Sequence, residues 1–134
     1  MKNIAEEKTV AEDKHCSASL AAIEDTLYVI GGKWKLKVII ALREEGNMRF
    51  NELQRTITGI SARVLSNELK ELEMNGFINR KVYTTIPVVI EYGLTAYSNT
   101  LQNVLQEMID WGMKHRNKIK GDAKKKRLGT LKKL

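Results

Sequence analysis

A group of polar side chains in the middle of the chain has the chemistry that is needed to bind double-stranded DNA. Their spacing would place them on one face of a helix: Arg63, Ser66, Asn67 and Lys70. An arginine can bind guanine and an asparagine can bind adenine through paired hydrogen bonds, while a serine can reach a base or a phosphate. The lysine lies about two turns further into the helix and suits a phosphate. We therefore predict that this segment reads DNA.

The helix that would carry these residues has signals at both ends. Ser61 can cap its N-terminus, and Gly76 supplies the left-handed residue that often ends a helix. Between them, leucines recur at the spacing of one buried stripe: Leu65, Leu69 and Leu72. An ordinary core helix shows the same pattern, so the neighbouring segments must decide between the two interpretations. Glu68 and Glu71 are expected to face solvent or the segment that follows, away from the polar face.

A second, shorter helix is predicted just before this one, with Asn51 as its N-cap. A Thr-Gly pair at residues 58–59 makes a tight turn between the two helices. A helix, a glycine-containing turn and a serine-capped helix form the helix-turn-helix pattern, whose second helix enters the major groove. Arg49 and Asn51, at the positive start of the first helix, are predicted to contact the phosphate backbone, and Ser61 is a further predicted DNA contact.

Two β-branched segments follow, at residues 79–84 and 88–94. The turn between them contains Thr-Ile-Pro, so the two segments predict a hairpin that forms a wing beside the helices. Thr85, in this turn, is predicted as another DNA contact. The fold class is therefore predicted to be mainly α with a small β-hairpin wing, an α+β winged helix-turn-helix.

Two amphipathic helices flank this unit and are predicted to form a dimer interface. Residues 19–30 carry apolar side chains three or four apart, and a helix beginning at Thr95 carries a heptad seam. The predicted interface residues are Leu20, Ile23, Leu27, Leu101, Val104, Leu105, Met108 and Trp111. The same residues could complete a monomer core, but two such helices on one small domain would expose a large apolar strip, which favours association. A twofold dimer predicts an inverted-repeat operator with half-sites roughly 34 Å, or a multiple of it, apart.

The composition bounds the domain organisation. With 134 residues, 43% of them hydrophobic, the chain can bury one core, whose centre is predicted to be a helix over residues 33–45. Residues 1–18 are expected to form a flexible N-terminal arm, residues 19–117 the DNA-binding and dimerisation domain, and residues 118–134 a basic tail. No apolar run approaches the roughly 20 residues that cross a bilayer, and no signal peptide is evident, so we expect a cytoplasmic protein without a membrane partner.

The positive charge is concentrated at one end of the chain. The formal net charge is +7, and residues 114–134 contain ten basic residues and one acidic residue, a surplus of +9. The remaining 13 basic and 15 acidic residues give −2, so the body is nearly neutral. A basic run of this kind adds DNA affinity that does not depend on sequence, because it displaces counterions from the phosphates.

Other classes of function find little support. A single cysteine excludes an internal disulfide, and one Cys with two His at no finger-like spacing predicts no metal site. No phosphate-binding loop or G-x-G-x-x-G string is present, and neither histidine has acidic partners at motif spacing, so no cofactor and no catalysis are expected. The alternative is a module whose last helix and basic tail bind a partner helix or anionic lipid.

Several strings, in this order, resemble the HxlR-type family of bacterial winged-helix transcriptional regulators. They are I-G-G-K-W-K at 30–35, R-F-N-E-L at 49–53, G-I-S-A-R-V-L at 59–65, L-K-E-L-E-M-N-G at 69–76, E-Y-G-L-T at 91–95 and W-G at 111–112. The resemblance implies a dimeric DNA-binding repressor or activator, whose effector it does not identify. Where the family tends to place Arg or Lys before its Val-Glu-Tyr string, this chain has two valines at 88–89.

Some members of that family sense electrophiles or oxidants through an N-terminal cysteine, which makes Cys16 a candidate redox switch. The family's cysteine is usually followed by Pro and would align near Ala21, whereas Ser17 follows Cys16. Since the chain has no second cysteine, oxidation would give an intersubunit disulfide, a mixed disulfide or a sulfenic acid.

Overall fold

The structure, a computed structural model, describes the backbone of residues 4–132 and the side chains of residues 17–129. Its first element is one long helix, α1 (Ile4–Ile30). The prediction that this helix begins at Ser19 is wrong. The preceding residues are rich in Ala, Glu and Lys, which favour a helix even where apolar residues show no periodicity. The boundary expected after residue 18 therefore falls inside α1.

Helix α2 (Lys35–Glu45) lies at the centre of the core, as its wide apolar face predicts. Its inward side chains are almost fully covered: Val38, Ile39, Ala41 and Leu42. The four-residue connection from α1 begins with two glycines, and a Cβ on Gly31 would collide with the backbone oxygen of Leu27. Gly32 has φ +92°, in the left-handed region that side chains disfavour, so this connection depends on the absence of side chains.

Helices α3 (Phe50–Thr56) and α4 (Ala62–Met74) form the predicted helix-turn-helix. In the turn between them Gly59 has φ +88°, which an L-residue with a Cβ rarely adopts. On the inner side of α4 the three leucines of the predicted stripe are buried: Leu65, Leu69 and Leu72. The helix is therefore fixed by its buried side, and its opposite side is left for other contacts.

Of the two predicted N-caps, the one for α4 is confirmed and the one for α3 is wrong. The Ser61 cap is confirmed, since the Val64 N–H donates to Ser61 Oγ at 3.2 Å. The Asn51 cap is wrong, because the extended Arg49 directly precedes α3 without a side-chain capping bond and Asn51 lies within the first turn. The short strand β1 leads directly into α3, so the helix begins at Phe50, earlier in the chain than predicted. Gly76, with φ +83°, follows the end of α4 as predicted.

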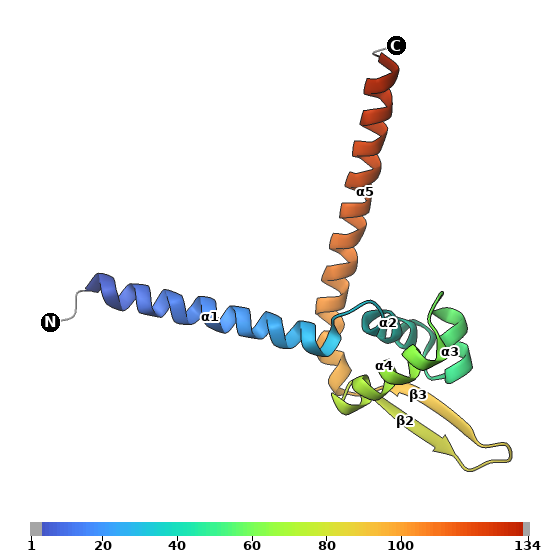
Figure 1. The fold of residues 1–134 in the computed structure, drawn as a ribbon. Coiled ribbons are helices and arrows are strands. Elements are labelled where there is room, and N and C mark those ends of the chain that lie inside the picture. The colour runs from blue at the N-terminus through green and yellow to red at the C-terminus, as the bar shows by residue number, and fades with distance from the viewer. Residues whose placement is uncertain (1–3, 133–134) are drawn as a thin grey trace. The chain divides into compact units, whose positions relative to one another are not determined.

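A three-stranded antiparallel sheet lies beside the helices: β1 (Met48–Arg49), β2 (Ile78–Tyr83) and β3 (Val89–Leu94), in the order β1-β3-β2. Strands β2 and β3 form the predicted hairpin. The two ends of each strand differ by at most one residue from the predicted ends. Figure 1 shows the hairpin extending beyond the helices as a wing. Its base is closed by the Thr95 N–H, which donates to the Phe77 carbonyl at 3.1 Å, and is tied to the end of α4 by the Thr95 hydroxyl, which donates to the Gly76 carbonyl.

The chain divides into two compact units, Met1–Tyr97 and Ser98–Leu134, and the second contains most of η1 (Tyr97–Leu101) and all of α5 (Gln102–Lys132). The last α-helix thus begins later than the predicted Thr95, because a 3-10 turn precedes it. It also continues through most of the predicted basic tail, so the expected boundary at residue 118 lies inside a helix. Within the described residues, no helix is long and apolar enough to cross a membrane.

Candidate nucleic-acid interface

The outer face of α4 brings together the central group of predicted DNA contacts. Arg63, Asn67 and Lys70 are exposed and Ser66 is half-buried, on the side of the helix opposite the buried leucines. Arginine and lysine present only donors, while serine and the asparagine amide both donate and accept. This combination can bind base edges and phosphates but provides no nucleophile paired with a base. The arrangement is therefore that of a binding surface.

The other predicted contacts surround this face. Arg49 and Asn51 are exposed where β1 enters α3, and Ser61 is exposed at the start of α4. Arg49 Nε lies 3.9 Å from Glu52 Oε1, but both side chains are about half exposed, so this ion pair leaves the guanidinium largely available. Thr85 is exposed in the turn between β2 and β3, and its hydroxyl donates to the Pro87 carbonyl at 2.8 Å.

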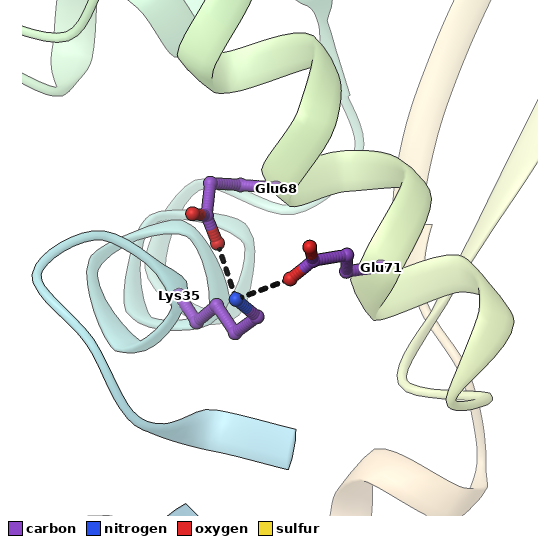
Figure 2. Close-up of polar contacts among 3 residues, drawn as sticks. All are labelled: Lys35, Glu68 and Glu71. Carbon is purple, nitrogen blue, oxygen red and sulfur yellow. Dashed lines mark ion pairs between the residues drawn. The ribbon is translucent and has the colours of Figure 1, made fainter. Parts of the chain in front are cut away.

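Two acidic residues of α4 are held away from this face by a lysine of α2. Lys35 Nζ lies 2.8 Å from Glu68 Oε2 and 2.6 Å from Glu71 Oε2, and Lys35 itself is only 8% exposed (Figure 2). The expectation that these glutamates face solvent or the wing is therefore wrong for Glu68, whose side chain is 20% exposed, and incomplete for Glu71. Both face α2, and their partner lies more than thirty residues earlier in the chain, where helical spacing gives no indication of it.

The ion pairs also affect the ionisation of the lysine. Burial alone would lower the pKa of Lys35, but hydrogen bonds and charge interactions with Glu68 and Glu71 outweigh it, and the pKa is raised above its ordinary value. The ammonium therefore stays charged throughout the neutral range and neutralises part of the negative charge on the adjacent helix. This reduces the repulsion that two carboxylates near a DNA-binding face would cause.

The structure adds a residue, Arg80, that was not among the predicted contacts. A hollow of about 320 Å³ opens between α4 and the hairpin, lined by Ser66, Leu69, Lys70, Glu73, Arg80 and Tyr92. Arg80 lies directly across from Tyr92 in the β2–β3 register. Alternation along the strand places Arg80 on the same side as the buried Ile78, and that pattern was the signal available in the sequence.

Helix α1 carries the first half of the predicted dimer interface. Leu20, Ile23 and Leu27 are each at least 60% exposed in the single chain. Tyr28 adds a large exposed ring next to them. Large apolar side chains gathered on one helix are uncommon on a surface that stays in water, so this side of α1 is suited to a partner.

Helix α5 carries the second half, with one difference from the prediction. Val104, Met108 and Trp111 are exposed and line a shallow hollow of about 610 Å³ together with Asn103 and Glu107. Leu101 is half-buried, and Leu105 is only 3% exposed in the single chain. Leu105 therefore offers almost no surface to a partner, since helical spacing turns it away from the exposed stripe.

Two remaining predictions concern other chemistry. Cys16 falls within α1, but its side chain lies outside the part of the chain whose side chains are described. Among the described residues, no group of three or more His, Cys, Asp or Glu side chains could hold a metal ion.

The fold and the exposed face of α4 define a winged helix-turn-helix DNA-binding protein. A sequence profile described as HxlR-like helix-turn-helix matches residues 29–120, and the chain belongs to this family. Similar curated proteins are an HTH-type transcriptional regulator of Halalkalibacterium halodurans (46% identical over 92 residues, 69% of this chain and 81% of that protein) and YtcD of Bacillus subtilis (42% over 102 residues, 76% and 80%).

A solved structure extends the similarity to the fold. The redox regulator HypR in its reduced form is 38% identical, with a TM-score of 0.69 over 75% of this chain and 98% of that chain. The family resemblance and the predicted winged-helix fold are thereby confirmed. The family and these relatives are transcriptional regulators, so this chain is a regulator of that class and the prediction of a protein that is not an enzyme is confirmed.

Proposed function

We propose that this regulator binds an inverted-repeat operator as a homodimer and places α4 of each copy in the major groove. The observation that carries the proposal is the outer face of α4, where Arg63 and Asn67 are exposed one helical turn apart on a helix fixed by buried leucines. In this arrangement Arg63 and Asn67 contact base edges. Phosphates are contacted by the surrounding residues: Arg49, Asn51, Ser61, Ser66, Lys70 and Thr85.

The dimer in this proposal uses the exposed apolar sides of α1 and α5. Burying such a surface is favourable by about 25 cal/mol per Å² of apolar area, which makes association the natural use of two such helices. The interface residues are Leu20, Ile23, Leu27, Val104, Met108 and Trp111, with Leu101 at the margin. Leu105 is left out because the single chain already covers it.

Cys16 is proposed as a redox-sensitive residue. HypR is described as a redox regulator, and the structure of YodB from B. subtilis, also similar to this chain, is of the diamide-treated protein. The protein is proposed to act in the cytoplasm of a bacterial cell, where a thiol of this kind stays reduced until an oxidant appears. If Cys16→Ser leaves the response of DNA binding to diamide unchanged, the thiol has no such role.

The experiment that tests the proposal measures binding to a generic duplex and to anionic vesicles, each over a range of salt concentrations. The proposal expects retention on DNA with a steep salt dependence, because phosphate contacts release counterions. Binding to vesicles alone would favour the alternative, a surface-binding helical module. Sedimentation of the free protein measures the dimer separately, and a monomer at micromolar concentration would contradict that part.

A further inference from the structure

The hollow between α4 and the wing combines two cations with two hydroxyl groups. Lys70 and Arg80 come from different elements, Ser66 and Tyr92 add hydrogen-bonding groups, and Leu69 forms part of the lining. Within the described residues, neither Lys70 nor Arg80 forms an ion pair in this chain. An unpaired arginine next to an unpaired lysine is a favourable site for an anion, because Arg offers a planar fork of donors and Lys a point charge.

The position of the hollow indicates which anion it would meet. Ser66 and Lys70 belong to the same outer face of α4 as Arg63 and Asn67, and strand alternation turns Arg80 toward α4 while its neighbour Lys81 points to the other side of the sheet. A helix in the major groove has a row of phosphates along each side. The hollow therefore opens where a DNA backbone would pass the edge of α4.

We propose that this hollow binds one backbone phosphate of the operator, with Lys70 supplied by α4 and Arg80 by β2. The inference rests on the proposed function and deepens it, because one phosphate held from both elements would fix the wing and the reading helix to the same DNA strand. Glu73, also in the lining, opposes the phosphate, so the site carries a net charge of only one positive unit. The contact adds affinity and register without reading a base.

The test uses a duplex that the wild-type protein selects from a random pool and a second duplex of unrelated sequence. Arg80→Gln should weaken binding to both duplexes by about tenfold. It should also make the slope of the logarithm of the binding constant against the logarithm of salt concentration shallower by about one. Lys81→Gln is the matched control, since it removes the same charge one residue away on the opposite side of β2, and it should change either quantity much less. Arg80→Lys should keep most of the salt slope.

A second variant tests the same site in the opposite direction. Glu73→Gln removes the opposing carboxylate and should tighten binding to both duplexes by about threefold. Circular dichroism and thermal unfolding of each variant show whether the fold is kept. If Arg80→Gln is folded and binds like Lys81→Gln, or if it loses sequence preference rather than overall affinity, the phosphate site is wrong.

Two further outcomes separate this inference from others. Failure of the wild-type protein to bind any duplex would overturn the proposed function itself, whereas normal wild-type binding with no effect of Arg80→Gln overturns only the phosphate site. Replacing chloride by inorganic phosphate at constant ionic strength tests whether the hollow holds an anion. Free phosphate would compete with the DNA backbone for Lys70 and Arg80, so DNA binding by wild type should fall more than that of Arg80→Gln, and an equal fall in both proteins would contradict the phosphate site.

Discussion

At the scale of single residues, Lys35 is the charged side chain that joins α2 to α4. It is nearly buried and pairs with Glu68 and Glu71 at 2.8 and 2.6 Å, so its removal would leave two carboxylates facing each other against α2. Removing one partner of a buried pair costs several kcal/mol, but Glu71 is more than half exposed, so we expect Lys35→Met to destabilise the protein by about 2 kcal/mol. Urea unfolding measures this, with Lys37→Met as the exposed control on the same helix.

The difference in unfolding free energy between wild type and Lys35→Met should decrease at high pH. Because the pKa of Lys35 is raised in the folded state, its contribution to stability is fully present below the unfolded lysine pKa of about 10.4 and is lost as the pH rises through the folded value. The stability gap between wild type and Lys35→Met should therefore be constant from pH 7 to 9 and shrink above about pH 10.5. A gap that shrinks instead as the pH is lowered toward 7 would contradict this account.

Arg63 and Asn67 are the residues on which sequence reading should depend. Replacing either with Ala removes a paired contact to a base, which is worth about 1–3 kcal/mol of discrimination. Each variant should lose preference for the operator over a duplex changed at one position, while its binding to unrelated DNA falls less. Arg43→Ala, an exposed arginine on α2, is the control for lost charge. Equal losses on operator and unrelated DNA would mean that the two residues contact only phosphate.

At the scale of elements, the connection between α1 and α2 leaves no room for a side chain at Gly31. Gly31→Ala would push a methyl group into the Leu27 carbonyl and should destabilise the protein by about 2 kcal/mol. Gly112→Ala is the matched control, because nothing lies within 4 Å of a Cβ there and Gly112 is inside α5, where Ala favours the helix by about 1 kcal/mol. The thermal unfolding midpoint should fall for Gly31→Ala and rise for Gly112→Ala. Shifts of the same sign in the two variants would contradict the structure.

The elements also show which features the sequence could predict. Helix α4 was predictable because its signals are local: the Ser61 cap, the leucine spacing and Gly76 all lie within one short segment. The start of α1 was not, since propensity rather than an apolar pattern carries it back to Ile4. The Lys35 ion pairs and the position of Arg80 beside α4 depend on packing and strand register, which join residues far apart in the sequence. Leu105 was wrongly included in the dimer interface predicted from the heptad spacing. That spacing shows that a helix has an apolar side, but not which residues of that side are already buried within the single chain.

At the scale of the whole molecule, the positive charge is concentrated at the C-terminal end, in residues 114–134, most of which lie beyond the part of the chain that the family profile covers. The family profile ends at residue 120, whereas α5 continues to Lys132, and the basic side chains of residues 124–127 are exposed. Truncation after Arg116 should lower the salt slope of DNA binding and leave sequence preference intact, because counterion release does not depend on base sequence. Exchanging the basic residues 124–127 for Gln in the full chain is the control for lost length. A collapse of specificity would mean that this part of α5 does more than attract phosphate.

The central claim is that two copies of α4 read one operator, and selection of duplexes from a random pool by the full-length protein tests it most directly. If the protein is a twofold dimer, the selected sequences should contain an inverted repeat with half-sites about 34 Å apart, or a multiple of that distance. A single unrepeated site, or enrichment of no sequence at all, would contradict the account.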